Sequence, residues 1–125
     1  MEDNTPKSKY NLEARLIDFA IMILDLSEQL PSTFAGKHLG GQIARSSTSP
    51  ALNYGEAQAA ESKADFSHKM KICLKELRET QICLKIIHKR KMTKVEISEP
   101  ALKECGELVA IFTSSIEKIK ANSLK

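Results

Sequence analysis

The sequence predicts an all-α protein, an antiparallel up-and-down four-helix bundle, on three observations. Four long segments carry apolar residues at alternating spacings of three and four, the pattern of one face of a helix. No segment alternates apolar and polar residues over the length of a strand, and there is no Asn-Gly hairpin signal. The length of 125 residues, 42% of them hydrophobic and 28% charged, suits one domain with one core. We expect a flexible segment at 1–11, the bundle at 12–121 and a tail at 122–125.

The first helix is expected to begin near Leu12 and to end before Pro31. Its apolar residues form one stripe: Leu12, Leu16, Phe19, Ile23, Leu26 and Leu30. Pro31 ends this segment because proline lacks an amide donor and crowds the preceding turn. Ser32 or Thr33 can then cap the second helix by accepting a hydrogen bond from one of its free amides.

The second helix is expected from about Phe34 to Ala60, and its inward stripe is small and partly polar. That stripe consists of Leu39, Ile43, Ser46, Pro50, Asn53 and Ala57. A neighbouring backbone could approach closely along such a stripe. Pro50 predicts either a kink in one helix or a second helix that restarts with Ser49 as its cap. We favour a single helix kinked near Pro50.

The third helix is expected to start after Ser62, which can cap it, with Asp65 in the position of a capping box. Its stripe contains Phe66, Met70, Cys73, Leu77, Thr80, Leu84 and Ile87. Further apolar residues lie outside this stripe, namely Ile72, Ile82, Cys83 and Ile86. One bundle core cannot enclose both sets.

The fourth helix is expected to open at Ser98, as a cap, followed by Glu99 and Pro100 in the first turn, where an acid and a proline are both favourable. Its stripe contains Leu102, Cys105, Val109, Phe112, Ile116 and Ile119. Leu108 and Ile111 lie outside it. The extra apolar residues on the third and fourth helices predict a surface that a partner covers.

Features of the termini and cysteines favour a cytoplasmic protein. The first nine residues contain no apolar signal region, and no apolar run approaches the roughly 20 residues of a membrane helix. Three cysteines, Cys73, Cys83 and Cys105, form neither a CxxC pair nor an even set, so we expect core thiols and no disulfide framework.

Positive charge is concentrated in the third helix and the turn after it. Residues 63–97 carry ten basic and four acidic side chains, whereas residues 1–62 carry five and eight. The densest part contains Lys85, His88, Lys89, Arg90, Lys91 and Lys94. The helix dipole alone favours cations at this end, but clustered cations also attract phosphates. These six residues are our candidate nucleic-acid-binding site, with no aromatic residue among them to stack on bases.

Two pairs of glutamates provide the alternative, enzymatic hypothesis. The pairs are Glu76 with Glu79 and Glu104 with Glu107. Facing one another, they could hold magnesium as in bundle-type nucleotide pyrophosphohydrolases. Lys75, Arg78 and Lys103 flank them, however, so solvated ion-paired faces explain them more simply. No Glu-x-x-His pair or glycine-rich phosphate loop is present, and we expect no catalytic residue, metal or cofactor.

Two strings in the second and third helices are specific enough to suggest a family. They are QIARSSTSPALNYGEA at 42–57 and ADFSHKMKICLKELRET at 64–80. They resemble the bacterial four-helix-bundle family named after the 23S ribosomal RNA intervening-sequence protein, over roughly residues 12–119. The family is similar to the accessory protein of diversity-generating retroelements, a bundle that forms a ring of five and binds nucleic acid. The resemblance therefore implies a homopentamer.

The residues that carry the resemblance are expected to be structural or to lie at an interface. They are Gln42, Arg45, Ser46, Ser49, Asn53, Glu56 and, on the third helix, Glu76. A pocket in which they act as ligands is the competing interpretation. We prefer Asn53 and Glu56 as buried or interfacial polar groups that fix the register between helices. The expected partners are other copies of the chain, RNA or DNA, or a further protein, and not a membrane.

Overall fold

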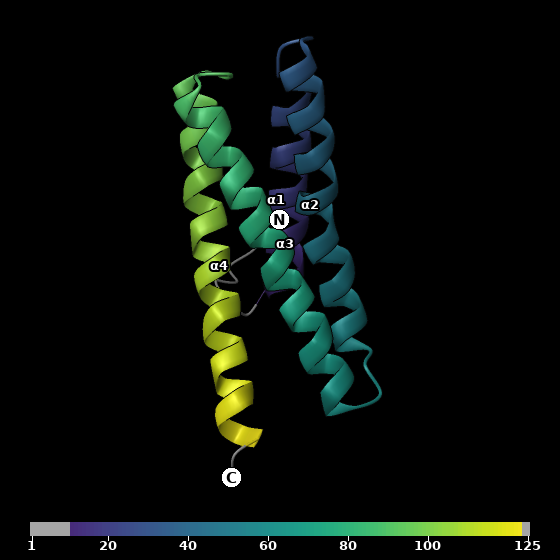
Figure 1. The fold of residues 1–125 in the computed structure, drawn as a ribbon. Coiled ribbons are helices and arrows are strands. Elements are labelled where there is room, and N and C mark those ends of the chain that lie inside the picture. Colours follow the sequence, from purple (N-terminus) through teal and green to yellow (C-terminus); the bar gives the residue numbers. More distant parts are fainter. Residues whose placement is uncertain (1–10, 124–125) are drawn as a thin grey trace, which may run out of the picture.

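The computed structural model describes residues 11–123, and these form four antiparallel helices joined by short turns (Figure 1). The helices are α1 (Leu12–Glu28), α2 (Phe34–Gln58), α3 (Lys63–Lys89) and α4 (Val95–Ser123). Residues 11–123 contain no strand. The prediction of an all-α, up-and-down four-helix bundle is confirmed. The segment predicted to be flexible lies, apart from Asn11, outside the described residues.

Two predicted caps are present. The Thr33 Oγ1 accepts a hydrogen bond from the Gly36 amide at 3.1 Å, and the Ser62 Oγ accepts one from the Asp65 amide at 3.0 Å. Each bond satisfies an amide that has no partner within its helix. Gly36 is required beside the first cap, because a Cβ there would lie 1.9 Å from the carbonyl oxygen of Pro31. The α1–α2 turn is therefore closed by backbone contact.

The second helix continues through Pro50 without interruption. Ser49 is therefore not the cap of a restarted helix, and the single helix that we favoured is observed. The kink near Pro50 stays a prediction. Pro50 is buried, and its carbonyl oxygen accepts a hydrogen bond from the Cys73 thiol of α3 at 3.4 Å.

The predicted start of the fourth helix is wrong by one turn. The helix begins at Val95, where the Lys94 carbonyl accepts hydrogen bonds from the amides of Ile97 and Ser98. Ser98 is therefore not an exposed cap but lies inside the helix, fully buried, with its Oγ 2.7 Å from the His88 Nδ1. Pro100 is tolerated so near the helix start because the carbonyl that it leaves free belongs to exposed Glu96. The helix ends at Ser123, beyond the boundary expected at 121.

One core runs through the bundle between all four helices. Its fully buried large side chains include Phe19 of α1, Ile43 of α2, Leu77 of α3 and Phe112 of α4. Of the residues that we placed outside the core, Leu108 is in fact fully buried, while Ile72 and Ile111 are half-buried. Ile82 and Ile86 are exposed, as expected. The apolar excess is therefore smaller on α4 than the spacing predicted.

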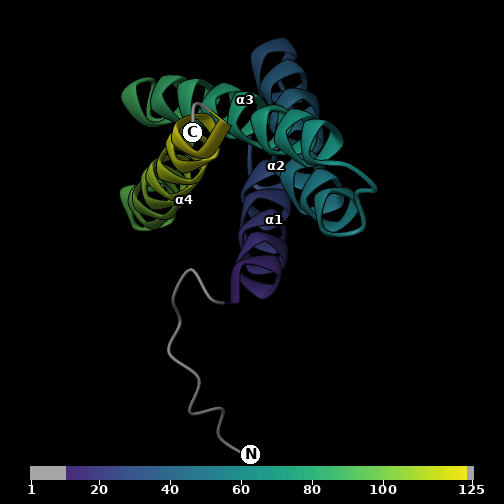
Figure 2. The ribbon, with the colours of Figure 1, turned by 90° about the horizontal axis from the view of Figure 1, so that it is seen from below.

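The helices do not pack equally closely. The closest contact is between α2 and α3, and the sparsest among the four neighbouring pairs is between α1 and α4. Seen along the bundle, the helices are tilted against one another, and α1 and α4 diverge (Figure 2). Among the described residues, no helix is both long and apolar enough to cross a membrane.

Candidate functional site

The predicted cation cluster lies at the end of α3 and in the α3–α4 turn. We call Lys85, Lys89, Arg90, Lys91 and Lys94 the basic turn cluster. All five are exposed, and within residues 11–123 none of them forms an ion pair with a carboxylate. The negative end of the α3 dipole favours cations here, but it leaves their charge facing solvent. The cluster can therefore attract an anion from solution.

His88, the sixth residue of the predicted site, lies apart from the other five. It is half-buried in the seam between α3 and α4, and its Nδ1 is engaged with the Oγ of buried Ser98. This hydrogen bond joins the end of α3 to the first turns of α4. His88 thus supports the turn that carries the cations.

Sequence reasoning missed an aromatic residue at the same end of the bundle. Phe34 is 88% exposed at the start of α2, and its ring stacks on that of His38 at a centroid distance of 6.3 Å. The α1–α2 and α3–α4 turns share this end (Figure 1). Gln29, directly after α1, lines a pocket of about 450 Å³ together with Lys91 and Lys94. The exposure of Phe34 could have been predicted from the sequence, because Phe34 falls outside the inward apolar stripe of its helix.

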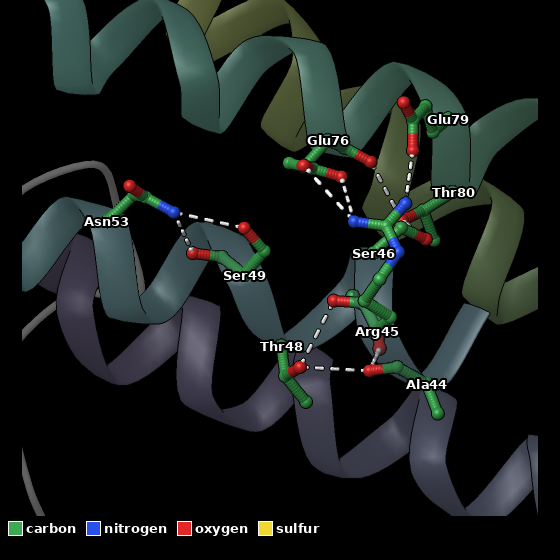
Figure 3. Close-up of polar contacts among 10 residues, drawn as sticks. Ala44, Arg45, Ser46, Thr48, Ser49, Asn53, Glu76, Glu79 and Thr80 are labelled. Carbon is green, nitrogen blue, oxygen red and sulfur yellow. Dashed lines mark hydrogen bonds and ion pairs between the residues drawn. The ribbon is translucent and has the colours of Figure 1, made fainter. Parts of the chain in front are cut away.

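Arg45 binds both members of the first glutamate pair (Figure 3). Its Nη1 lies 3.1 Å from the Glu76 Oε1, and its Nη2 lies 2.6 Å from the Glu79 Oε2. We call this group the Arg45 clamp. The hydrogen bonds to Glu79 and Glu76 raise the pKa of Arg45 further above its usual value. The clamp ties α2 to α3 and neutralises Glu76, which is nearly buried.

A buried pair of hydroxyls lies beside the Arg45 clamp (Figure 3). The Thr80 Oγ1 donates to the carbonyl oxygen of Glu76 at 2.9 Å. Its oxygen lies 2.7 Å from the Ser46 Oγ, which must then donate to it. Both residues are fully buried. The small side chain of Ser46 thus allows α2 and α3 to meet closely and still satisfies both hydroxyls.

The remaining motif residues on α2 are less buried than we expected. Asn53 is half-buried, and its Nδ2 donates to the carbonyl and the Oγ of Ser49, both at 3.0 Å, within the same helix. Glu56 is exposed and forms an ion pair with Lys69 of α3 at 2.7 Å. Gln42 is half-buried beside Glu79 and Cys83. Of Asn53, Glu56 and Gln42, only Glu56 forms a hydrogen bond or ion pair with another helix within residues 11–123, and that ion pair lies at the surface.

A second clamp holds the second glutamate pair. Arg15 of α1 donates from Nε to the Glu104 Oε2 at 2.7 Å and from Nη2 to the Glu107 Oε1 at 2.6 Å. This is the Arg15 clamp, and the hydrogen bond to Glu104 raises the pKa of Arg15 well above its usual value.

The two glutamate pairs therefore bind arginines of different neighbouring helices and do not face one another. No group of three or more metal-ligating side chains gathers anywhere in residues 11–123. The geometry that the magnesium hypothesis requires is not formed by the four glutamates in this chain.

All three cysteines are free and buried. Burial raises the pKa of Cys73 and that of Cys105 to about 12. The Sγ atoms of both donate to backbone carbonyls, of Pro50 and Leu77 respectively. Burial also raises the pKa of Cys83, which lies at the edge of the core. These thiols act as small apolar core groups.

Comparison with known proteins agrees with this architecture. A crystal structure from Bacteroides thetaiotaomicron, described as a protein of unknown function from the S23 ribosomal protein family, superposes with a TM-score of 0.74 at 30% sequence identity. The match covers 83% of this chain and 96% of that one. A search among curated proteins gives no match. The family profile described as 23S rRNA-intervening sequence protein matches residues 9–114. The chain therefore belongs to the 23S rRNA-intervening sequence protein family.

Proposed function

We propose that this protein is a non-enzymatic helical bundle that assembles with copies of itself, in the ring of five that the family resemblance implies, and that binds RNA or DNA. The apolar surface left outside the core supports the assembly. Among residues 11–123 nine large apolar side chains are exposed: Ile17, Ile21, Met22, Leu24, Phe34, Leu52, Ile82, Ile86 and Val95. Several of them lie on shared helix faces, and such surface commonly marks an interface.

Light scattering coupled to size exclusion tests the assembly at micromolar concentration. We expect a mass of five times the 13.9 kDa of one chain. A different multiple would replace the ring of five but keep the assembly. A mass equal to one chain across the accessible concentration range would reject it.

The non-enzymatic part of the proposal is supported by the two arginine clamps. Each engages its glutamates with hydrogen bonds shorter than 3.4 Å, so the carboxylates are occupied by protein cations. A panel of nucleoside triphosphates with magnesium tests the alternative of a nucleotide pyrophosphohydrolase. We expect no release of pyrophosphate above buffer. Turnover that disappears in Glu104→Gln would restore the enzymatic hypothesis.

Nucleic-acid binding is supported by the basic turn cluster, whose charges have no carboxylate partner among the described residues 11–123. Binding should weaken steeply with salt, because each phosphate contact releases condensed counterions. The variant Lys89→Ala/Arg90→Ala/Lys91→Ala should lower the slope of log K against log salt by about 0.9 per lost contact on duplex DNA. A matched control is Lys63→Ala/Lys103→Ala/Lys118→Ala, which removes the same charge elsewhere on α3 and α4. Equal loss in both variants would reject this site.

Phe34 sharpens the choice between single-stranded and duplex nucleic acid. An exposed aromatic ring near cations can stack on an unpaired base, worth about 1–3 kcal/mol per base. Phe34→Ala should therefore weaken binding of a single-stranded oligonucleotide more than binding of a duplex. Leu52→Ala is the control, because Leu52 is also exposed on α2 but lies away from that end. Equal effects of the two variants would exclude stacking on Phe34.

We also place the protein in the cytoplasm. The three free thiols suit a reducing compartment, where disulfides are rare. Fractionation of the source cells with an antibody to the protein tests this placement, and recovery from a membrane or secreted fraction would reject it.

A further inference from the structure

The outer face of α1 is apolar and acidic. Ile17, Ile21 and Leu24 are all exposed and follow one another at spacings of four and three, on the side of α1 opposite to the core. Glu13 and Glu28 lie on the same side at the two ends of this stripe, and Asp18 and Asp25 along one edge. None of these four acids forms an ion pair within residues 11–123. We call this surface the acidic face.

The outer face of α3 is apolar and basic. It contains a shallow groove of about 730 Å³ lined by apolar side chains of α3 and α4, among them Leu74, Ile82 and Ile116. Lys71, Lys75 and Arg78 also line it and are exposed. Glu79, the one carboxylate that lines the groove among residues 11–123, is already bound in the Arg45 clamp. We call this surface the basic groove.

We propose that the basic groove receives the acidic face of a second copy of this chain, so that α1 of one protomer lies along α3 of the next. Both surfaces leave isoleucines about half-exposed, with Ile21 at 52% and Ile82 at 55%. Each surface combines its apolar residues with charges of one sign that form no ion pair in the described part of the chain, and the two signs are opposite. Two different patches of one chain therefore complement each other in hydrophobicity and in charge.

This choice of surfaces fixes the type of assembly. Contact between α1 and α3 is heterologous, because each protomer gives one face and receives the other. Every protomer in a pair then still has one unused face, either acidic or basic, to which a further copy can add. Repetition of the contact gives a ring where the rotation between protomers closes, as the proposed ring of five requires, and an open filament where it does not. A symmetric contact of α1 with α1, or of α3 with α3, would place like charges opposite each other. The inference rests on the proposed assembly and specifies which surfaces make it.

Charge reversal on each face tests the inference. One variant is Asp18→Lys/Asp25→Lys and the other is Lys75→Glu/Arg78→Glu, in the full chain. Controls with the same charge changes are Glu61→Lys/Glu117→Lys and Lys63→Glu/Lys118→Glu, all at exposed positions. Circular dichroism checks that each variant is folded. We expect each face variant to dissociate at a concentration at least tenfold above wild type, by sedimentation velocity, and the controls to assemble normally.

Mixing the two face variants gives the sharper result. In the mixture the reversed acidic face meets the reversed groove, and the two native surfaces also remain available to each other. We expect oligomers that contain both variants to form, as native mass spectrometry can detect. A ring of five cannot alternate the two variants throughout, so it should hold them three to two, with one unfavourable contact between copies of the same variant. A symmetric contact through one face would instead leave the variant altered on the other face to assemble like wild type by itself.

Other outcomes overturn the inference and separate it from the proposed function. If wild type assembles and both face variants assemble equally well, the protomers meet through other surfaces. If the face variants dissociate and no oligomer that contains both of them forms on mixing, the two faces do not contact each other. If wild type is a monomer at all concentrations, the proposed assembly and this inference both fail.

Discussion

The α2–α3 and α1–α4 contacts contain the same kind of ion-pair cluster, but they differ in how closely the helices pack around it. In each, an arginine of one helix binds two glutamates spaced by three on the other. In the α2–α3 seam the arginine is 53% exposed and lies beside close packing through Ser46 and Thr80. In the sparser α1–α4 seam the arginine is only 18% exposed. The same ion-pair pattern therefore supplements packing in one seam and replaces part of it in the other.

The largest expected effect is on the rate of cysteine modification, which reports how well the contact between α2 and α3 excludes solvent. Cys73 lies inside it and has a pKa of about 12, so at pH 8 its thiolate fraction is about a thousandfold below that of an ordinary thiol. Ellman's reagent should modify Cys83, at the edge of the core, long before Cys73 or Cys105. Mass spectrometry of digested protein assigns the sites. Equal rates at Cys73 and Cys83 would mean that the seam opens readily.

The second expected effect comes from filling the α2–α3 seam. Ser46→Leu adds bulk against Thr80 and removes its hydrogen-bond donor. We expect the free energy of unfolding in urea to fall by about 3 kcal/mol, from overpacking of about 1–3 kcal/mol and a lost hydrogen bond of about 1 kcal/mol. Ser46→Ala, which removes only the hydrogen bond, should cost about 1 kcal/mol. Equal losses in the two variants would show that the seam has room.

The third effect tests the α1–α4 seam. Arg15→Met leaves Glu104 and Glu107 without their cation in a partly buried place. We expect a loss of about 2 kcal/mol, the size of one hydrogen bond to a charged group, because Glu107 remains accessible to water. Lys103→Met, on the same surface of α4, should change stability by less than about 0.5 kcal/mol. Similar values for both would show that the Arg15 clamp does not join the helices.

The smallest effect is expected from Arg45→Met. Arg45 faces solvent and its seam is held by packing, so the loss should be smaller than in Arg15→Met. Glu76 would increase this loss of stability, because its side chain is only 12% exposed and would be left without its cation. Adding Glu76→Gln to Arg45→Met should recover part of the loss in urea unfolding. A larger loss than in Arg15→Met would mean that burial of the glutamate decides the energy of a clamp.

The helices were predictable because each has a regular inward stripe and three of them have clear boundaries. Thr33 and Ser62 cap as their sequence positions suggest. The start of α4 was not predictable from Ser98 and Pro100. A serine is tolerated one turn inside a helix when its hydroxyl has a hydrogen-bond partner, and a proline is tolerated there when the carbonyl that it leaves free is exposed. Ser98 has the His88 ring as its partner, which only the tertiary structure reveals.

The sites were less predictable than the fold, because spacing shows which residues share a face but not what that face meets. Leu108 was assigned to the surface although it is fully buried, since α4 turns a wider face inward than one stripe. The apolar outer face of α1 was overlooked because only the inward stripe of that helix was counted. The clamps required knowledge of which helices are neighbours.

Lys91 gives the α3–α4 turn an unusual property. Its backbone φ of 58° lies in the left-handed region, where a side chain is disfavoured and glycine is at ease. Glycine would therefore be more stable than lysine at this position. The lysine costs backbone strain but adds a positive charge to the basic turn cluster. Lys91→Gly should therefore raise the melting temperature and at the same time remove one positive charge from the basic turn cluster. The two effects would separate the stability of the turn from its affinity for a polyanion.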